Sequence, residues 1–575
     1  MLRRIFSYMK EYKKYAWLAL ICIGVEVVLE IMVPKLMADL IDIGVTNSDV
    51  PYIINKGIQM AVCAVAALIL GVGSARFSAL AGQGLGANIR KAEYERLQSY
   101  SFSNIDHFSV SSLVTRLTSD VTNIQNAVST GMRPFGRSPV MLIFATTLAF
   151  QINSTLALVF LVALPVLAVL LIIIIINVGP RYRRMQGAVD LVNRCIEENL
   201  TAVRVVKSYV RGDYEIEKFG HVNNNLKNES EKAFGIAVLN MPAMQFVMYS
   251  TILGILLIGG RLINSGQMMI GQLTSFLSYV LLILNSLMMM SNVFLLMTRS
   301  LASAERIMKV IDEPIDITDE NAKDIEVKKG EIEFNHVWFK YKDTAKEYVL
   351  SDVSFHINAG QTVGIIGQTG SSKTTLIQLI PRLYDATKGE IKIDGINVKE
   401  YPVRHLRDAI SVVLQKNTLF SGSLIDNLRW GDENATLDEI KEACSIACVD
   451  EFIDRLPGGL DAEMGQEGVN VSGGQKQRIC IARAILKKPK VLILDDSTSA
   501  VDTATEGKIR NALAKKLPDM TKIIIAQRIS SVCHADQIII MDGGRVDAIG
   551  THESLLRTNK IYQEIYESQK EGADL

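Results

Sequence analysis

The chain has 575 residues, too many for one hydrophobic core, so its length predicts at least two domains. A composition that is 49% hydrophobic and 21% charged excludes a disordered chain, and seven dispersed cysteines exclude a disulfide framework. The formal net charge is zero, which gives no indication of a nucleic-acid partner, but residues 1–300 carry +8 and residues 301–575 carry −8. A hydrophobic, basic half followed by a charged, acidic half indicates a membrane domain joined to a soluble one.

The first half contains six apolar stretches, each near the roughly 20 residues that cross a bilayer as a helix. Twenty Lys and Arg lie in the connections on one side of these stretches, and the connections on the other side hold only Arg261. The positive-inside rule therefore predicts six crossings, with both termini in the cytoplasm. The six stretches lie at about 15–38, 57–80, 137–151, 154–177, 236–260 and 268–298.

Two long connections, of 55 and 58 residues, separate these stretches on the cytoplasmic side. They look helical throughout and lack the Gly, Pro and Ser bias of a linker. We predict that the membrane helices extend into the cytoplasm as long rods. Two small inserted domains are the alternative, but neither connection has enough apolar residues for its own core.

Two carboxylates, Glu26 and Glu30, lie one helical turn apart inside the first apolar stretch. Ionisable groups at that depth are costly and usually face a cavity or a partner helix. One interpretation is an acidic patch that attracts cationic cargo. The interpretation that we favour is that they pair with a neighbouring helix or lie near a wet lateral opening.

Residues 1–310 form the predicted membrane domain and residues 311–328 a linker. From residue 329 to 575, short β-rich runs alternate with helical segments, which is typical of an α/β domain. Within it, VGIIGQTGSSKTTLIQLI (363–380) reads as a strand, a Gly-rich turn and a helix. It resembles a P-loop, whose backbone N–H groups bind phosphates. Lys373 would then reach the phosphates and the Thr374 hydroxyl would bind Mg²⁺.

The P-loop pattern has one departure: Ser372 stands where the second glycine is usual. We expect its Cβ to be tolerated if the backbone there is already helical, so that nucleotide binding survives.

Two further sequence motifs lie after the P-loop. The segment KVLILDDSTSAVD (490–502) fits a Walker B strand, with Asp495 reaching Mg²⁺ through water. Between the two lies VSGGQKQR (471–478), whose small residues can present backbone amides to a γ-phosphate at a helix N-terminus. The three motifs in this order predict an ATP-binding domain with Mg²⁺ as its metal.

With these motifs the chain resembles an ABC exporter half-transporter over nearly its full length. The resemblance implies an all-α six-helix transmembrane domain with long cytoplasmic helical extensions, followed by an α/β P-loop ABC ATPase domain. It implies coupling helices near residues 105–113 and 207–216, an exporter-specific loop at Gln466–Gly468 and a D-loop at Ser499–Asp502. It also implies that Tyr341 stacks on adenine and that Gln415 binds Mg²⁺. The residues that would contact the nucleotide are Tyr341, Gly367, Gln368, Thr369, Gly370, Ser371, Ser372, Lys373, Thr374, Thr375, Ser472, Gly473, Gly474 and Gln475.

Two positions depart from the family at the point where hydrolysis occurs. The residue after Asp495 is a glutamate in the family and Asp496 here, which withdraws the carboxylate by more than about 1 Å. Where the family has a switch histidine, this chain has Gln527, which cannot carry a proton as imidazole does. We predict a site that binds ATP and hydrolyses it poorly.

In this family each site forms between two chains, the P-loop of one facing the signature motif of the other. Because the VSGGQ motif is intact here, a partner with the usual glutamate and histidine would gain one good site. We therefore predict one half of a heterodimeric, ATP-driven exporter in a bacterial cytoplasmic membrane, moving amphipathic or hydrophobic cargo out of the cytoplasm or inner leaflet. The alternatives are a homodimeric exporter or lipid flippase, and an ATP-gated channel or regulator.

Overall fold

The chain divides into two compact units in a computed structural model that describes residues 1–342, 344–496 and 501–571. The first unit holds Met1–Gln98 and Ser111–Asp312. The second holds Ser99–Val110 and Glu313–Leu575, so it includes a short piece of the first long connection.

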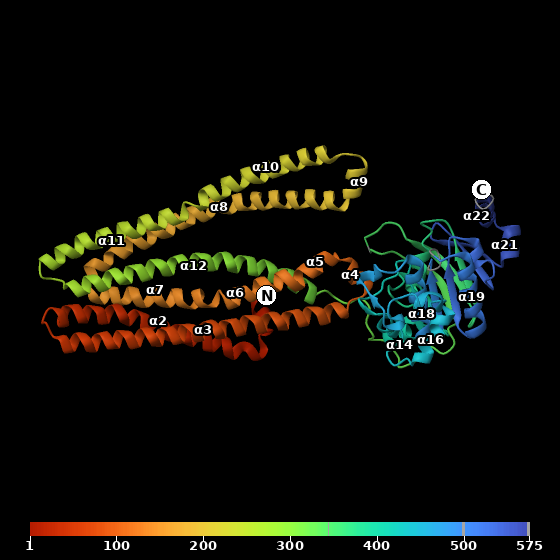
Figure 1. The fold of residues 1–575 in the computed structure, drawn as a ribbon, viewed down its shortest axis with the longest axis horizontal. Helices are drawn as coiled ribbons and strands as arrows, with labels where there is room; N and C mark the ends of the chain where they lie inside the picture. The colour runs from red at the N-terminus through yellow and green to blue at the C-terminus, as the bar shows by residue number, and fades with distance from the viewer. Residues whose placement is uncertain (343, 497–500, 572–575) are drawn as a thin grey trace. The chain divides into compact units, whose positions relative to one another are not determined.

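The first unit is built from helices, of which the longest are α3 with 49 residues and α8 with 48 (Figure 1). At about 1.5 Å per residue, each runs for about 70 Å, more than twice the roughly 30 Å of a bilayer's hydrocarbon core. The helices are α1 (Leu2–Ser7), α2 (Lys13–Asp39), α3 (Val50–Gln98), α5 (Val110–Thr115), α6 (Val121–Ser129), α7 (Met132–Ile152), α8 (Ser154–Thr201), α9 (Val203–Ser208), α10 (Gly212–Ala237), α11 (Asn240–Asn264) and α12 (Ile270–Ile311), with π-helical turns at Leu40–Val45 and Arg116–Asp120.

A tight turn joins α7 to α8, between the apolar stretches predicted at 137–151 and 154–177. Asn153 alone separates the two helices, and its side chain caps α8 by accepting a hydrogen bond from the backbone N–H of Leu156 at 3.0 Å. The cap satisfies one of the donors that a helix start leaves open.

The six predicted membrane crossings are not equally clear in the length and hydropathy of the helices. Five helical segments of the described chain are long and apolar enough to cross a membrane, and a sixth apolar helix, Ser154–Leu167, is shorter. The shorter helix falls within the stretch predicted at 154–177. The five segments are Lys10–Val45, Val50–Gln98, Val110–Ile152, Gly212–Asn264 and Ile270–Met290.

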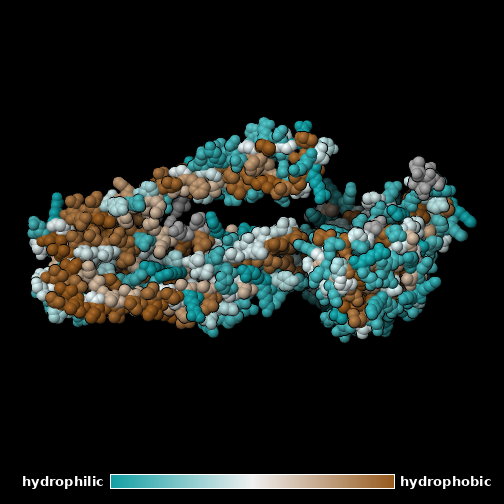
Figure 2. Space-filling model, viewed as in Figure 1, coloured by the Kyte–Doolittle hydropathy of each residue, from teal (hydrophilic) through white to brown (hydrophobic). Residues whose placement is uncertain are grey.

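The apolar surface of the helical unit is concentrated at one end. Figure 2 shows hydrophobic side chains gathered over the part in which α2, α7 and α11 lie in Figure 1, while α10 is largely hydrophilic on this face. Inside, α2, α7, α8, α11 and α12 share one hydrophobic core that includes Ile23, Met141, Phe160, Ile255 and Tyr279. Such a surface suits a unit surrounded by lipid at that end.

The second unit contains a six-stranded sheet in the order β12-β11-β3-β10-β9-β6, with only β12 antiparallel to its neighbour. A four-stranded antiparallel sheet, β2-β1-β4-β5, and a two-stranded one, β7-β8, complete it. The strands are β1 (Ile332–Phe339), β2 (Leu350–Ile357), β3 (Thr362–Ile366), β4 (Lys388–Ile393), β5 (Ile396–Asn397), β6 (Ile410–Val413), β7 (Gly422–Ser423), β8 (Glu463–Met464), β9 (Val491–Asp495), β10 (Thr521–Ile525), β11 (Gln537–Asp542) and β12 (Arg545–Gly550).

Both faces of the six-stranded sheet are buried, which explains why its central strands are continuous apolar runs rather than alternating ones. Along β9, Leu492 and Leu494 enter one core, and Val491 and Ile493 enter the other. The helices of this unit are α4 (Phe102–Asp106), α13 (Lys373–Leu379), α14 (Val403–Asp408), α15 (Leu424–Arg429), α16 (Leu437–Ile446), α17 (Asp450–Ile453), α18 (Gly473–Leu486), α19 (Thr503–Lys516), α20 (Ile529–Val532), α21 (His552–Thr558) and α22 (Lys560–Glu571).

The short helix α4 packs on the α/β domain of its own unit. The Tyr384 hydroxyl donates to Asp106 Oδ2 at 2.7 Å, and the rings of Tyr384 and Phe102 lie 6.1 Å apart. Coupling helices were expected near residues 105–113 and 207–216. Short helices begin a few residues before both positions, α4 in this unit, capped by Ser101, and α9 in the first unit, and their role as coupling helices stays a prediction.

Candidate functional site

Three loops meet at the carboxyl edge of the six-stranded sheet because β3, β10 and β9 are parallel neighbours. The P-loop follows β3, Asp495 and Asp496 end β9, and Gln527 follows β10. Polar side chains from three distant parts of the sequence are therefore placed side by side, at the edge where open α/β sheets bind their ligands.

The P-loop wraps around the side chain of Lys373. Its ammonium donates to the carbonyl oxygens of Gly367 and Gln368 at 2.8 and 2.9 Å, and to the Ser371 hydroxyl at 3.3 Å. A Cβ at Gly367 would collide with the carbonyl oxygen of Met541 on β11, so only glycine fits at the start of the loop. The loop thus holds a cation at the N-terminus of α13, where anions bind.

The backbone at Ser372 is not helical, which corrects the sequence-based expectation. Its φ of 70° and ψ of 23° place it in the left-handed region, where a Cβ is unfavourable. The loop geometry imposes this conformation directly before the first turn of α13. The serine is therefore accommodated at a cost rather than freely.

Asp495 and Thr374 supply oxygen atoms where a phosphate-bound cation would lie. The Thr374 hydroxyl donates to Asp495 Oδ1 at 3.2 Å, and Asp495 is 2% exposed. Its Oδ2 has no hydrogen-bond partner among the described residues. A buried carboxylate oxygen without a donor, beside a hydroxyl, fits a hard divalent cation such as Mg²⁺.

The two positions that depart from the family are in direct contact. Gln527 Nε2 donates to Asp496 Oδ2 at 2.9 Å, and Gln415 Nε2 lies 3.5 Å from the same oxygen. Asp496 also adopts a left-handed backbone, with φ of 47°. The shortened carboxylate is thus held by an amide instead of projecting freely into the site.

Burial is the largest influence on the pKa values of the charged groups in the site. It lowers the pKa of the Lys373 ammonium and raises the pKa of both Asp495 and Asp496, since each charged form loses hydration. The charges partly compensate, because the two carboxylates raise the pKa of Lys373 and Lys373 lowers theirs. The site is a compact set of mutually dependent charges.

A cavity of about 320 Å³ lies between these loops. Gly367, Gln368 and Tyr341 do not line it. The carbonyl oxygens of Gly367 and Gln368 accept from Lys373, and the Tyr341 hydroxyl lies 2.9 Å from that of Thr375. The residues that line the cavity are Thr369, Gly370, Ser371, Ser372, Lys373, Thr374, Thr375, Gln415, Asp495, Asp496, Ile525 and Gln527.

The signature residues Ser472, Gly473, Gly474 and Gln475 do not line this cavity. They begin α18, where Ser472 and Gln475 cap the helix reciprocally, with the backbone N–H of Ser472 2.8 Å from Gln475 Oε1. The D-loop residues Ser499 and Ala500 lie outside the described part of the chain. The signature therefore forms a second helix N-terminus, separate from that of α13, and its contact with a nucleotide stays a prediction.

Two residues outside the sequence motifs, Gln569 and Tyr384, contact residues of the site. Gln569 of α22 donates to the carbonyl oxygen of Gln527 at 2.7 Å and accepts from the backbone N–H of Ile529, which fixes the loop after β10. The Tyr341 ring lies 5.2 Å from that of Tyr384, which binds α4. Neither Gln569 nor Tyr384 stands in a motif, so only the fold reveals them.

Comparison with known proteins identifies both halves of the chain. Residues 16–287 match the family model of the ABC transporter transmembrane region, and residues 350–499 match the family model described as ABC transporter. The chain is 37% identical to the uncharacterized ABC transporter ATP-binding protein YfiB of Bacillus subtilis, over 100% of both chains. It is 32% identical to the ATP-dependent lipid A-core flippase of Pseudomonas putida, over 98% of this chain and 95% of that one.

The fold is also that of a solved structure. A bacterial Atm1-family ABC exporter with ATP bound superposes with a TM-score of 0.84 and 23% identity, covering 97% of this chain and 99% of that one. At this identity the likeness concerns the fold alone.

Replacing Ser372 by glycine should stabilise the chain, because glycine adopts the left-handed backbone without a Cβ clash. We expect Ser372→Gly to raise the melting temperature of the full chain in detergent by about 2 °C, corresponding to about 1 kcal/mol. Ser372→Ala is the matched control, since it removes the hydroxyl and keeps the Cβ. An equal rise in both variants would show that the backbone angle is not the cause.

Proposed function

We propose that this chain, which belongs to the ABC transporters and is an ATP-hydrolysing transporter of the exporter type, is one half of a heterodimeric exporter of amphipathic or hydrophobic compounds. Its own P-loop site binds ATP and hydrolyses it slowly. The observation that carries the proposal is the hydrogen bond between Asp496 and Gln527.

That contact supports slow hydrolysis for a geometric reason. A glutamate side chain is one C–C bond longer, about 1.5 Å, so its carboxylate could reach a water beyond the amide of Gln527. The Asp496 carboxylate is instead withdrawn and engaged by Gln527 Nε2. A displacement of this size in a catalytic group costs on the order of 100-fold in rate.

Nucleotide binding does not depend on these two residues. Lys373, the backbone amides of the P-loop and the N-terminus of α13 would hold the phosphates, and Tyr341 would meet the adenine. Thr374, Asp495 and Gln415 would hold Mg²⁺, which neutralises phosphate charge when bound. Bound ATP, because it is hydrolysed slowly, would then hold two nucleotide domains together for longer.

The intact signature explains why such a chain would be retained in a pump. Ser472, Gly473, Gly474 and Gln475 form a capped helix start that is exposed at Ser472 and Gly473 and does not line the chain's own cavity. In the proposed heterodimer they face the P-loop of a partner that carries glutamate and histidine, and hydrolysis there resets the cycle. The proposal assigns residues 1–310 to the membrane domain, 329–575 to the ATPase domain, and six crossings of a bacterial cytoplasmic membrane, with both termini and the ATPase in the cytoplasm.

Restoring the two usual side chains should convert the slow site into an active one. In the chain assembled without a partner, we expect Asp496→Glu with Gln527→His to raise ATP hydrolysis by about 100-fold over the unsubstituted chain. The measurement is phosphate release at saturating ATP and Mg²⁺.

The matched control is Asp496→Asn with Gln527→His, which removes the carboxylate and should show no rise. Binding of a fluorescent ATP analogue by all variants verifies that the site is intact. Rapid hydrolysis by the unsubstituted chain alone would contradict the slow-site proposal.

Tyr384 should transmit nucleotide binding to α4, because its ring contacts Tyr341 and its hydroxyl binds Asp106. In the full chain, we expect ATP to slow hydrogen exchange of the α4 amides by about tenfold, which is the factor of one charge-assisted hydrogen bond. Tyr384→Phe should abolish this protection with ATP affinity unchanged. Tyr401→Phe is the control, since it loses a hydrogen bond to Ile393 far from α4. Protection that persists in Tyr384→Phe would exclude this route.

A further inference from the structure

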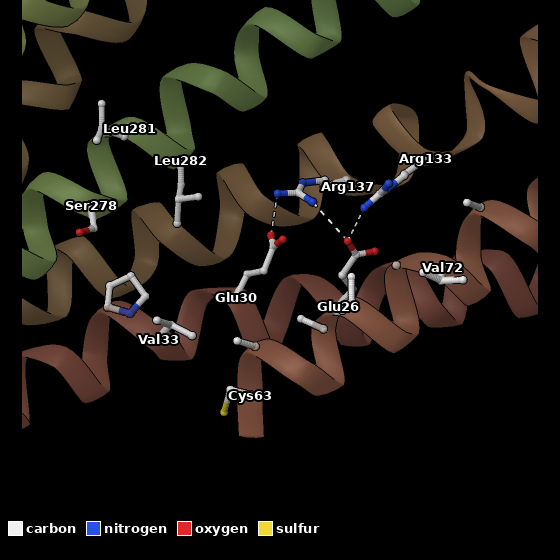
Figure 3. Close-up of a pocket in the computed structure, with 16 residues that line it drawn as sticks. Glu26, Glu30, Val33, Cys63, Val72, Arg133, Arg137, Ser278, Leu281 and Leu282 are labelled. Carbon is white, nitrogen blue, oxygen red and sulfur yellow. Dashed lines mark hydrogen bonds and ion pairs between the residues drawn. The ribbon is translucent and has the colours of Figure 1, made fainter. Parts of the chain in front are cut away.

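A cavity of about 760 Å³ lies within the helical unit, between α2, α3, α7 and α12. Its volume lies within the range of small-molecule sites. One end is charged, and Figure 3 shows Arg133 and Arg137 of α7 pointing toward Glu26 and Glu30 of α2. Most of the remaining wall is apolar, formed by Val33, Pro34, Ala64, Ala67, Leu68, Gly71, Val72, Ala75, Leu281 and Leu282.

The charged end confirms that the two glutamates pair with a neighbouring helix. Arg133 Nη2 donates to Glu26 Oε1 at 2.6 Å, and Arg137 Nη1 lies 3.4 Å from the same oxygen. Arg137 Nη2 lies 2.6 Å from Glu30 Oε2. Two carboxylates and two guanidinium groups bring the formal charge of the cluster to zero.

The pairing leaves acceptor capacity on the carboxylates, because Glu26 Oε2 and Glu30 Oε2 are both buried without a hydrogen-bond partner among the described residues, although Glu30 Oε2 is ion-paired with Arg137. Glu26 is 2% exposed, lines the cavity, and its Oε2 has no hydrogen-bond partner among the described residues. A buried carboxylate oxygen without a donor is costly, and more so in an apolar surrounding. The Arg133 side chain, in contrast, is 42% exposed, so its guanidinium can also bind an anion.

The part of the wall formed by α3 has small side chains beside the charged cluster. A Cβ at Gly71 would lie 3.1 Å from Glu26 Oε1 and 3.3 Å from Arg133, so the glycine lets α3 approach the charges closely. Ala64, Ala67, Gly71 and Ala75 recur at three- and four-residue spacing and so share one helix face. These small side chains leave the space that the cavity occupies.

We propose that this cavity binds a membrane phospholipid with a zwitterionic, primary-amine headgroup. The ammonium donates to Glu26 Oε2, the phosphate accepts from Arg133, and an acyl chain follows the apolar wall. A zwitterion keeps the cluster neutral, whereas a cationic or anionic headgroup would leave an unpaired charge in an apolar setting. A choline headgroup has no N–H to donate. The proposal concerns binding alone and holds whether or not the bound lipid is the exported compound.

The test is lipid retention by the assembled transporter, measured by native mass spectrometry after delipidation and incubation with equal amounts of phosphatidylethanolamine, phosphatidylcholine and phosphatidylglycerol. We expect phosphatidylethanolamine to be retained about tenfold over the other two, the factor of one charge-assisted hydrogen bond. Glu26→Gln should remove this preference and favour the anionic phosphatidylglycerol, because the cluster becomes positive.

Glu305→Gln is the matched control, because Glu305 pairs with Lys309 on an exposed face of α12, away from the cavity. Should Glu26→Gln fail to fold, Ala67→Leu fills the apolar wall with the charges intact and should lower retention of phosphatidylethanolamine about tenfold. Equal retention of the three lipids, or no lipid because the partner chain covers the cavity, would overturn the proposal. So would an unchanged preference in Glu26→Gln. Measurements of ATP binding and hydrolysis test the proposal for the nucleotide site independently of the lipid proposal.

Discussion

The parallel pairing of β3, β10 and β9 is the constraint on which the nucleotide site depends. With β10 in the middle, the P-loop after β3 and the aspartates at the end of β9 lie on either side of Gln527. Backbone hydrogen bonds reinforce the arrangement, since the N–H of Asp496 donates to the carbonyl oxygen of Ile525 at 3.0 Å. The sheet therefore sets the distance between the residue after Walker B and the switch position, whatever side chains stand there.

Within that fixed spacing, the two departures from the family compensate each other. The Asp496 carboxylate, shorter than a glutamate, accepts a hydrogen bond from the Gln527 amide, and Gln415 lies close to the same oxygen. Gln569 holds the Gln527 backbone from the other side. These two contacts hold the Asp496 carboxylate and the loop after β10 through groups of the chain itself, which supports the slow hydrolysis that we propose.

The site was predictable where its chemistry is local in sequence. A strand, a Gly-rich turn and a helix are adjacent in the chain, so Lys373 and Thr374 could be located from the pattern alone. The contact of Asp496 with Gln527 spans 31 residues, and that of Glu26 with Arg133 spans 107, so each requires the strand or helix order first. The left-handed backbone of Ser372 was missed because the residue type favours another conformation and the loop overrides it. The fourth apolar stretch shows a similar limit, since hydropathy alone does not decide where α8 leaves a membrane.

The chain holds buried charge in two different ways. In the nucleotide site, one ammonium faces two carboxylates, so the protein's own groups sum to −1 and offer a polyanion no net attraction. In the proposed site, backbone dipoles and a divalent cation would supply the attraction for the phosphates, so an acidic domain could bind ATP. Between α2 and α7, two guanidinium groups face two carboxylates, and no dipole or metal is needed. A neutral cluster with a free acceptor and an exposed donor selects against net charge in its ligand, and it favours a molecule that carries both signs on adjacent atoms.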